Sequence, residues 1–264
     1  MNIKTLALAA STAFSINAAA ADLEVLHYWT SGGEARSAAA LKDMMQAKGH
    51  TWKDFAVAGG GGDNATTVLK SRVMSGNAPV AAQIKGPAIQ EWAMEGVLGT
   101  LDGVARAENW DALLPDVIAG VMKYKGSYVA APVNVHRVNW LWASPEALSL
   151  AGVESMPTTF DEFFAAADKL KAAGLIAVAH GGQNWQDFTT FESVVLGIGG
   201  ADFYRNALVS LDPQALASDT MKLALETFRR IKAYTDAAAP GRDWNLATAL
   251  LMQGKAGFQF MGDW

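Results

Sequence analysis

The sequence predicts an α/β fold in which parallel strands and helices alternate through two lobes. Apolar segments of strand length are followed by segments of helix length along the whole chain, which is typical of α/β proteins with a mainly parallel sheet. Hydrophobic residues make up 51% of the chain and charged residues 18%, a balance that supplies ample core. We place the boundary between the lobes near residues 132–134, so that residues 22–133 form the amino-terminal lobe and residues 134–264 the carboxyl-terminal lobe.

Residues 1–21 are predicted to be a signal peptide. A short basic start with Lys4 precedes an apolar stretch at residues 6–16, and the alanines at 18–21 provide a small-residue cleavage site. The apolar stretch is too short to span a bilayer; the alternative is a helical or disordered start of a cytoplasmic protein. The chain has no cysteine, which argues against a lipoprotein anchor, disulfides and cysteine metal ligands. We therefore expect export to the periplasm with cleavage near Ala21.

The elements of the amino-terminal lobe follow from their apolar patterns and turn residues. A strand at residues 23–29 leads into a polar turn at residues 30–34. The later elements are predicted as helix 34–48, strand 52–58, a helix that ends at Met74 and is capped by Asp63 or Asn64, strand 80–84, helix 89–95 and a hairpin at 123–128. The stretch between residue 96 and the hairpin is expected to be rich in loops.

The carboxyl-terminal lobe continues the alternation. Pro145 lies in the first turn of its helix, where the missing N–H group of proline is tolerated. Thr159 and Glu162 have the spacing of a capping box. Strands are expected at 135–142, 175–179 and 255–260, and helices at 145–150, 159–173, 188–196, 219–234 and 246–252.

Common catalytic motifs are absent from the sequence. It contains no nucleophile elbow, no zinc-protease motif and no P-loop. The glycine run at residues 59–62 lacks a following Lys-Ser or Lys-Thr, so we interpret it as a flexible strand-to-helix connection. The four histidines have no metal-ligand spacing, and we expect no metal, no cofactor and no catalytic residue. One alternative stays open, because Glu34 and Asp263 could converge as the carboxylate pair of an exported carbohydrate enzyme.

The charge of the chain restricts its partners. A net charge of −5 argues against nucleic acid, whose phosphates attract clustered lysines and arginines, and against electrostatic attachment to a membrane. No segment after the signal approaches transmembrane length, so direct insertion into a membrane is not expected. We expect a monomer.

Tryptophans and polar groups gather at the predicted carboxyl ends of strands, where open α/β sheets bind ligands. A neutral sugar presents flat C–H faces that stack on indole rings, and hydroxyls that bond to charged or amide side chains. The pairings are Trp29 with Glu34, Gln83 with Lys85, Trp185 with Gln186, and Asp263 with Trp264. Any single pairing is more often a core tryptophan or a solvated charge, but the four together favour a sugar-binding site.

Five segments give the chain a specific resemblance to a known family. They are Tyr28–Glu34, Ala58–Ala65, Leu69–Val73, Val133–Trp142 and Phe258–Trp264. In this order they resemble the periplasmic sugar-binding proteins of ABC transporters, among the extracellular solute-binding proteins, and within them the glucose- and mannose-binding branch. The resemblance implies a two-lobed periplasmic binding protein fold of type II that closes on a monosaccharide. It also implies delivery of that sugar to a membrane permease.

Most of the expected ligand contacts are carried over from this branch. The first motif supplies a tryptophan and a glutamate, a short segment of the amino-terminal lobe supplies a lysine, and the Gly-Asp-Trp motif supplies a stacking aromatic ring beside a carboxylate. With Trp185 added from its pairing with Gln186, the expected ligand-binding residues are Trp29, Glu34, Gln83, Lys85, Trp185, Asp263 and Trp264. We interpret His136 and Asn139, near the first crossover between lobes, as structural.

Family members are considerably longer than this chain, so the carboxyl-terminal lobe is expected to be incomplete. A second alternative for the function is a protein of the same fold that binds a non-sugar solute, such as a polyamine or an oligopeptide. A polyamine site would need a cluster of carboxylates, whereas Lys85 at the expected cleft favours an uncharged or anionic ligand.

Overall fold

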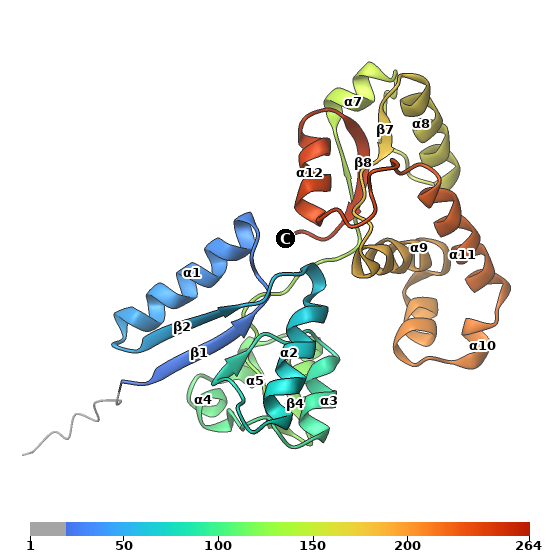
Figure 1. Cartoon of the computed structure of the whole chain (residues 1–264). Helices are drawn as coiled ribbons and strands as arrows, with labels where there is room; N and C mark the ends of the chain where they lie inside the picture. The colour runs from blue at the N-terminus through green and yellow to red at the C-terminus, as the bar shows by residue number, and fades with distance from the viewer. Residues whose placement is uncertain (1–19) are drawn as a thin grey trace, which may run out of the picture.

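The computed structural model describes residues 20–264 and shows an α/β protein with two lobes (Figure 1). The elements between residues 22 and 128 form the first lobe and those between 140 and 261 the second, and no sheet contains strands of both lobes. The predicted boundary at residues 133 and 134 falls in a segment without helix or strand, and it stays a prediction. Most of the predicted signal peptide, residues 1–19, lies outside the described residues. Within residues 20–264, no helix combines the length and apolar character that crossing a bilayer requires.

The first lobe is organised around β1 (Asp22–His27). This strand pairs in parallel with β2 (Thr51–Ala56) on one side and β3 (Ala81–Ala82) on the other. The helices that alternate with these strands are α1 (Gly32–Ala47), α2 (Asp63–Met74) and α3 (Ala88–Met94). Leu26 of β1 is fully buried and packs with Leu69 of α2 and Trp92 of α3. These elements confirm the predicted alternation, with shifted ends.

The start of α2 differs from the prediction. Its N-cap is Gly62, in the left-handed conformation at a φ of 85°, rather than Asp63 or Asn64. The side chain of Asn64 instead donates a 3.0 Å hydrogen bond to the carbonyl of Ala58. That bond spans the glycine run, which forms a 3₁₀ turn (η1, Gly60–Gly62). A capping rule based on side chains does not anticipate a backbone that only glycine adopts readily.

The expectation of loops after residue 96 was wrong. Three short helices, α4 (Asp102–Ala107), α5 (Trp110–Leu113) and α6 (Asp116–Met122), precede the predicted hairpin of β4 (Lys123–Tyr124) and β5 (Ser127–Tyr128). Tyr128 holds the first two of these helices, because its N–H group donates to Asp102 of α4 and its hydroxyl donates to Asp111 of α5, both at 2.8 Å. Helices this short show no clear periodicity in sequence.

The second lobe is built on a mixed sheet with β8 (Ala256–Met261) in the centre. β7 (Ile176–Val178) runs parallel to β8, whereas β6 (Trp140–Ala143) runs antiparallel to it. The expectation of a parallel sheet is therefore corrected for β6, whose direction depends on a partner more than a hundred residues away and leaves no local signal. The strand predicted from residue 135 is also shorter, since residues 135–139 are not part of it.

The second lobe contains seven helical elements. They are α7 (Pro145–Leu150), α8 (Phe160–Ala172), α9 (Asn184–Tyr204), a π-helical turn η2 (Arg205–Val209), α10 (Pro213–Leu216), α11 (Asp219–Lys232) and α12 (Trp244–Met252). Thr159 caps α8 as predicted, by accepting a 3.2 Å hydrogen bond from the N–H group of Glu162. Leu170, Val194, Ile231 and Phe258 are buried together in the main core. That core joins α8, α9 and α11 to β8.

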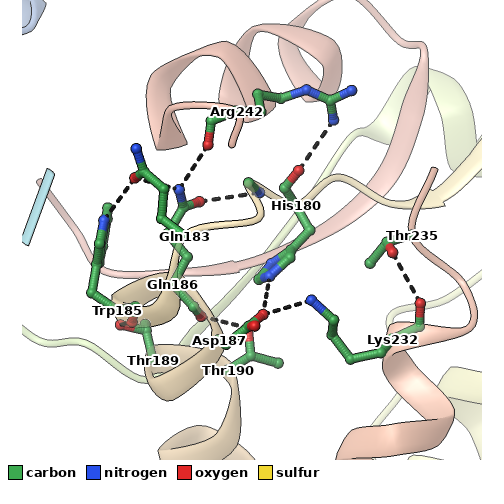
Figure 2. Close-up of polar contacts among 11 residues, drawn as sticks. His180, Gln183, Trp185, Gln186, Asp187, Thr189, Thr190, Lys232, Thr235 and Arg242 are labelled. Atoms are coloured by element: carbon green, nitrogen blue, oxygen red, sulfur yellow. Dashed lines mark hydrogen bonds and ion pairs between the residues drawn. The ribbon is translucent and has the colours of Figure 1, made fainter. Parts of the chain in front are cut away.

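A buried polar cluster lies beneath the start of α9 (Figure 2). His180 follows β7 and is 2% exposed, and its Nε2 lies 2.6 Å from Oδ1 of Asp187. Lys232 of α11 donates to the same oxygen at 2.6 Å. Burial lowers the pKa of His180, and the charges of Lys232 and Arg242 lower it further, whereas the hydrogen bond that the imidazole donates to Asp187 opposes this shift. The imidazole is therefore neutral at neutral pH.

Truncation of Leu170 tests the main core. Leu170→Ala removes a fully buried side chain of α8 and is expected to lower the free energy of unfolding by about 2–5 kcal/mol. Leu223→Ala on α11 is the matched control, because Leu223 is 52% exposed, and its effect should stay within about 1 kcal/mol. Urea unfolding measures both, and equal losses would contradict the proposed location of the core.

Replacement of His180 by glutamine tests the polar cluster. The pKa of folded His180 lies below its unfolded value of 6.5, so protonation favours the unfolded chain. The stability present above about pH 6.5 is therefore lost as the pH falls. Urea unfolding midpoints between about pH 7.5 and 5 should fall more steeply for the unsubstituted protein than for His180→Gln. If the unfolding midpoints of the two proteins fall equally with pH, His180 does not contribute to the pH dependence of stability.

Candidate ligand-binding site

The candidate site lies between the two lobes. Figure 1 shows the end of the chain between α1 of the first lobe and α12 of the second. Trp29 follows β1 and Gln83 follows β3, whose shared direction brings their carboxyl ends to one edge of the first sheet. Asp263 and Trp264 follow β8. Trp185 is the exception, because it lies in the first turn of α9 and not at a strand end as predicted.

Trp185 and Trp264, called here the tryptophan pair, are the aromatic part of the site. Their ring centroids are 6.0 Å apart and their planes are inclined by 50°. The ring of His136 meets Trp264 edge to face at 5.5 Å. His136 Nδ1 also lies 2.8 Å from Oδ1 of Asp263. His136, which we expected to be structural, therefore contacts two predicted ligand-binding residues with one imidazole ring.

The glycine turn, residues 59–62, contacts Trp185 from the first lobe. A Cβ atom at Gly60 would lie 2.9 Å from the indole Nε1, and one at Gly61 would lie 2.5 Å from its Cγ. Real side chains do not tolerate such distances, so the close approach of the ring requires glycine. A side chain of the second lobe thus packs directly on the backbone of the first. The run is the strand-to-helix connection that was predicted, but it also forms part of the lobe contact.

Tyr28 contacts both the glycine turn and Gln83, and sequence reasoning missed it. Its N–H group donates to Oε1 of Gln83 at 3.2 Å, and a Cβ at Gly62 would lie 2.7 Å from its ring. Burial raises the pKa of Tyr28 to about 12, and the charge of Glu34 adds to the effect. Glu34 accepts a 2.5 Å hydrogen bond from the hydroxyl of Ser31. Its carboxylate therefore sits near a neutral phenol.

Trp29 and Lys85 interact with residues outside the predicted set. Trp29 is half-buried, and its N–H group donates to Nδ1 of His27 at 3.2 Å. Lys85 is exposed, but its charge reaches Glu192 of α9. Burial raises the pKa of Glu192, and the hydrogen bond from Tyr204 and the charge of Lys85 partly offset that rise. In residues 20–264, neither Trp29 nor Lys85 makes an aromatic contact or a side-chain hydrogen bond with the other five.

A cavity of about 590 Å³ opens beside the end of β8. Three tryptophans line it, Trp142, Trp244 and Trp264, together with the polar side chains of Gln259 and Asp263. Neither Trp142 nor Trp244 is among the expected ligand-binding residues, and Trp244 lies far from any predicted strand end. Within the described part of the chain, no group of three or more histidine, aspartate and glutamate side chains is arranged to hold a metal ion.

Comparison with known proteins shows close relatives. A probable sugar-binding periplasmic protein of Brucella suis is 51% identical over 243 residues, which cover 92% of this chain and 57% of the relative. One of Rhizobium meliloti is 51% identical over 93% of this chain and 59% of the relative. The glucose-binding protein GlcS of Saccharolobus solfataricus is 26% identical over 91% of this chain and 45% of its own length. The chain thus spans about half the length of the curated relatives it matches.

Solved structures share the fold. A structure from a study of xylan utilization by a thermophilic Caldanaerobius polysaccharolyticus has a TM-score of 0.79 at 21% identity, over 91% of this chain and 61% of that one. A chitin oligosaccharide binding protein has a TM-score of 0.79 at 16% identity, over 92% and 62%. These likenesses confirm the predicted α/β, two-lobed fold of type II periplasmic binding proteins. The family model of the bacterial extracellular solute-binding proteins matches residues 29–264, and the chain belongs to that family.

Proposed function

We propose that the protein binds a monosaccharide, glucose or mannose, in the periplasm and delivers it to the import permease of an ABC transporter. The observation that carries the proposal is the tryptophan pair, flanked by Asp263 and His136, between two lobes that touch through Trp185. Relatives that are half identical to this chain are named as sugar-binding periplasmic proteins. The likeness to a glucose-binding protein supports the choice of hexose.

The polar groups of the site suit sugar hydroxyls. Burial raises the pKa of Asp263, but the hydrogen bond and charge of His136 and backbone hydrogen bonds together outweigh burial, and the net shift is downward. Asp263 is therefore an ionised acceptor whose orientation is set by His136, and Glu34 is oriented by Ser31 in the same way. Hydrogen bonds to charged groups contribute about 1.5–3 kcal/mol each. Two of them and indole stacking account for a large part of the roughly 8 kcal/mol of a micromolar complex.

Binding is proposed to favour a closed arrangement of the lobes. The site draws Glu34 and Gln83 from the first lobe and Trp185, Asp263 and Trp264 from the second, so a sugar between them contacts both lobes only when they approach. A ligand shifts such an equilibrium by its difference in affinity for the two arrangements. The closed surface is then the form that the permease recognises.

The structure favours a ligand-binding role over a catalytic role for the carboxylates of Glu34 and Asp263. Glu34 and Asp263 lie on different lobes, and each is already bonded to a local partner, Ser31 and His136 respectively. The family itself consists of solute-binding proteins. Release of product from a glycoside by the purified protein would instead support the exported carbohydrate enzyme.

Sugar binding and its site are tested together by calorimetry on the protein expressed from its complete natural gene. Glucose or mannose should bind more tightly than other sugars, a polyamine or an oligopeptide. Trp264→Ala and Glu34→Ala should each weaken binding by about tenfold or more, since each removes a direct contact of at least about 1.4 kcal/mol. Glu108→Ala, at an exposed position of the first lobe, is the control.

Two results would contradict this proposal in different ways. Unchanged affinity in both Trp264→Ala and Glu34→Ala would refute the site assignment while leaving sugar binding intact. If no sugar gives a heat of binding, although cooperative unfolding shows that the protein is folded, sugar binding itself would be refuted.

Gly60→Ala tests the contact between the lobes. Gly60 does not have a positive φ, and the three atoms nearest to a Cβ there all belong to the indole of Trp185. The methyl group should therefore hinder lobe approach without straining the backbone, and weaken sugar binding by about tenfold. Gly120→Ala in α6, where a Cβ meets nothing within 4 Å, is the matched control. Equal affinities of the two variants would show that this contact is not needed.

A further inference from the structure

A polar network fixes the edge of the Trp185 indole (Figure 2). Trp185 Nε1 donates to Oε1 of Gln183 at 2.8 Å. The same oxygen accepts a second hydrogen bond, from Nε2 of Gln186 at 2.9 Å. The amide nitrogen of Gln183 donates to Oδ1 of Asp243 at 2.7 Å. Every polar atom of the Gln183 side chain is thus engaged, and one of its partners is the proposed sugar-stacking ring.

Gln186 determines which way Gln183 points. Gln186 is fully buried, its Oε1 accepts from the N–H group of Gly181 at 3.1 Å, and its Nε2 donates to the carbonyl of Arg242 at 3.0 Å. These backbone partners have fixed polarity, so the Gln186 amide cannot be reversed without leaving buried groups unpaired. Its Nε2 must then meet an acceptor on Gln183. The oxygen of Gln183 consequently faces both Gln186 and Trp185.

The position of Gln183 in α9 makes its contacts unusual. It is the N-cap residue of that helix, yet its side chain makes no capping hydrogen bond. Burying an amide side chain costs free energy unless its polar atoms are hydrogen-bonded. The side chain of Gln186 is bonded to the backbone of Gly181 and Arg242, and these bonds hold that loop against the helix. Helix capping therefore does not explain this pair of glutamines, whereas the orientation of Trp185 does.

We propose that Gln183 is a positioning residue that holds the Trp185 indole ready to stack on the sugar, with Gln186 and Asp243 fixing Gln183 in turn. The inference rests on the proposed sugar-binding function. Its physical basis is preorganisation, because a side chain ordered before binding does not lose its freedom on binding. The network also connects Trp185 to the start of α12, since Asp243 precedes Trp244, which lines the cavity beside Trp264.

The test is a double-mutant cycle measured by calorimetry with glucose and mannose. Gln183→Met keeps the length of the side chain and removes its hydrogen bonds. It should weaken binding by about threefold to tenfold in the presence of Trp185 and have no effect in a Trp185→Phe background, since phenylalanine has no Nε1–H group. Asp243→Ala should give a smaller loss with the same dependence on Trp185. Gln214→Met, at an exposed position of α10, is the control.

A second measurement needs no sugar. In ¹⁵N-tryptophan spectra, the indole signal that Trp185→Phe removes belongs to Trp185. Gln183→Met should shift this signal and speed its hydrogen exchange, whereas Gln214→Met should leave it unchanged. An unmoved signal, or equal losses of affinity with and without Trp185, would overturn the positioning role. If the indole signal moves but the unsubstituted protein binds no sugar, the proposed function fails and the sugar-presenting role fails with it.

Discussion

The packing of Trp185 on the backbone of Gly60 and Gly61 is the contact on which the rest of the site depends. It joins a side chain of the second lobe to the main chain of the first, and the same indole lies beside Trp264. Because these two glycines have no Cβ, a flat ring can approach where any other residue would hold it away. The spacing between the polar groups of the two lobes follows from that approach.

Strand direction supplies the remaining geometry. β1 and β3 are parallel, so Tyr28 and Gln83 emerge at the same edge and bond to each other. In the second lobe, β8 is buried along its whole length and is followed by Asp263, whose carboxylate is paired with His136 from the segment between the lobes. Polar groups beside both sheets are therefore already oriented by neighbours, and this arrangement would lower the entropic cost of binding the proposed sugar.

Features encoded by neighbouring residues were predictable from the sequence, and features set by distant contacts were not. The strand and turn before Glu34, the cap at Thr159 and the adjacency of Asp263 and Trp264 are local. The antiparallel direction of β6 and the pairing of His136 with Asp263 join residues more than a hundred positions apart. The true start of α9 was missed because its first turn has Trp185 as its one apolar residue, so the apolar helical period begins later in the sequence than the helix itself.

That first turn of α9 couples the binding site to the interior of the second lobe. Trp185 faces the glycine turn, Gln186 is buried beneath it, and Asp187 pairs with His180 and Lys232. Successive residues of one helical turn point in different directions, so a single turn serves the cleft and the core together. A substitution that loosens this turn should therefore change both ligand affinity and the response of stability to pH. Trp264 contacts the ring of Trp185 but forms no hydrogen bond with the His180 cluster in residues 20–264, so changes at Trp264 should affect ligand affinity more than the response of stability to pH.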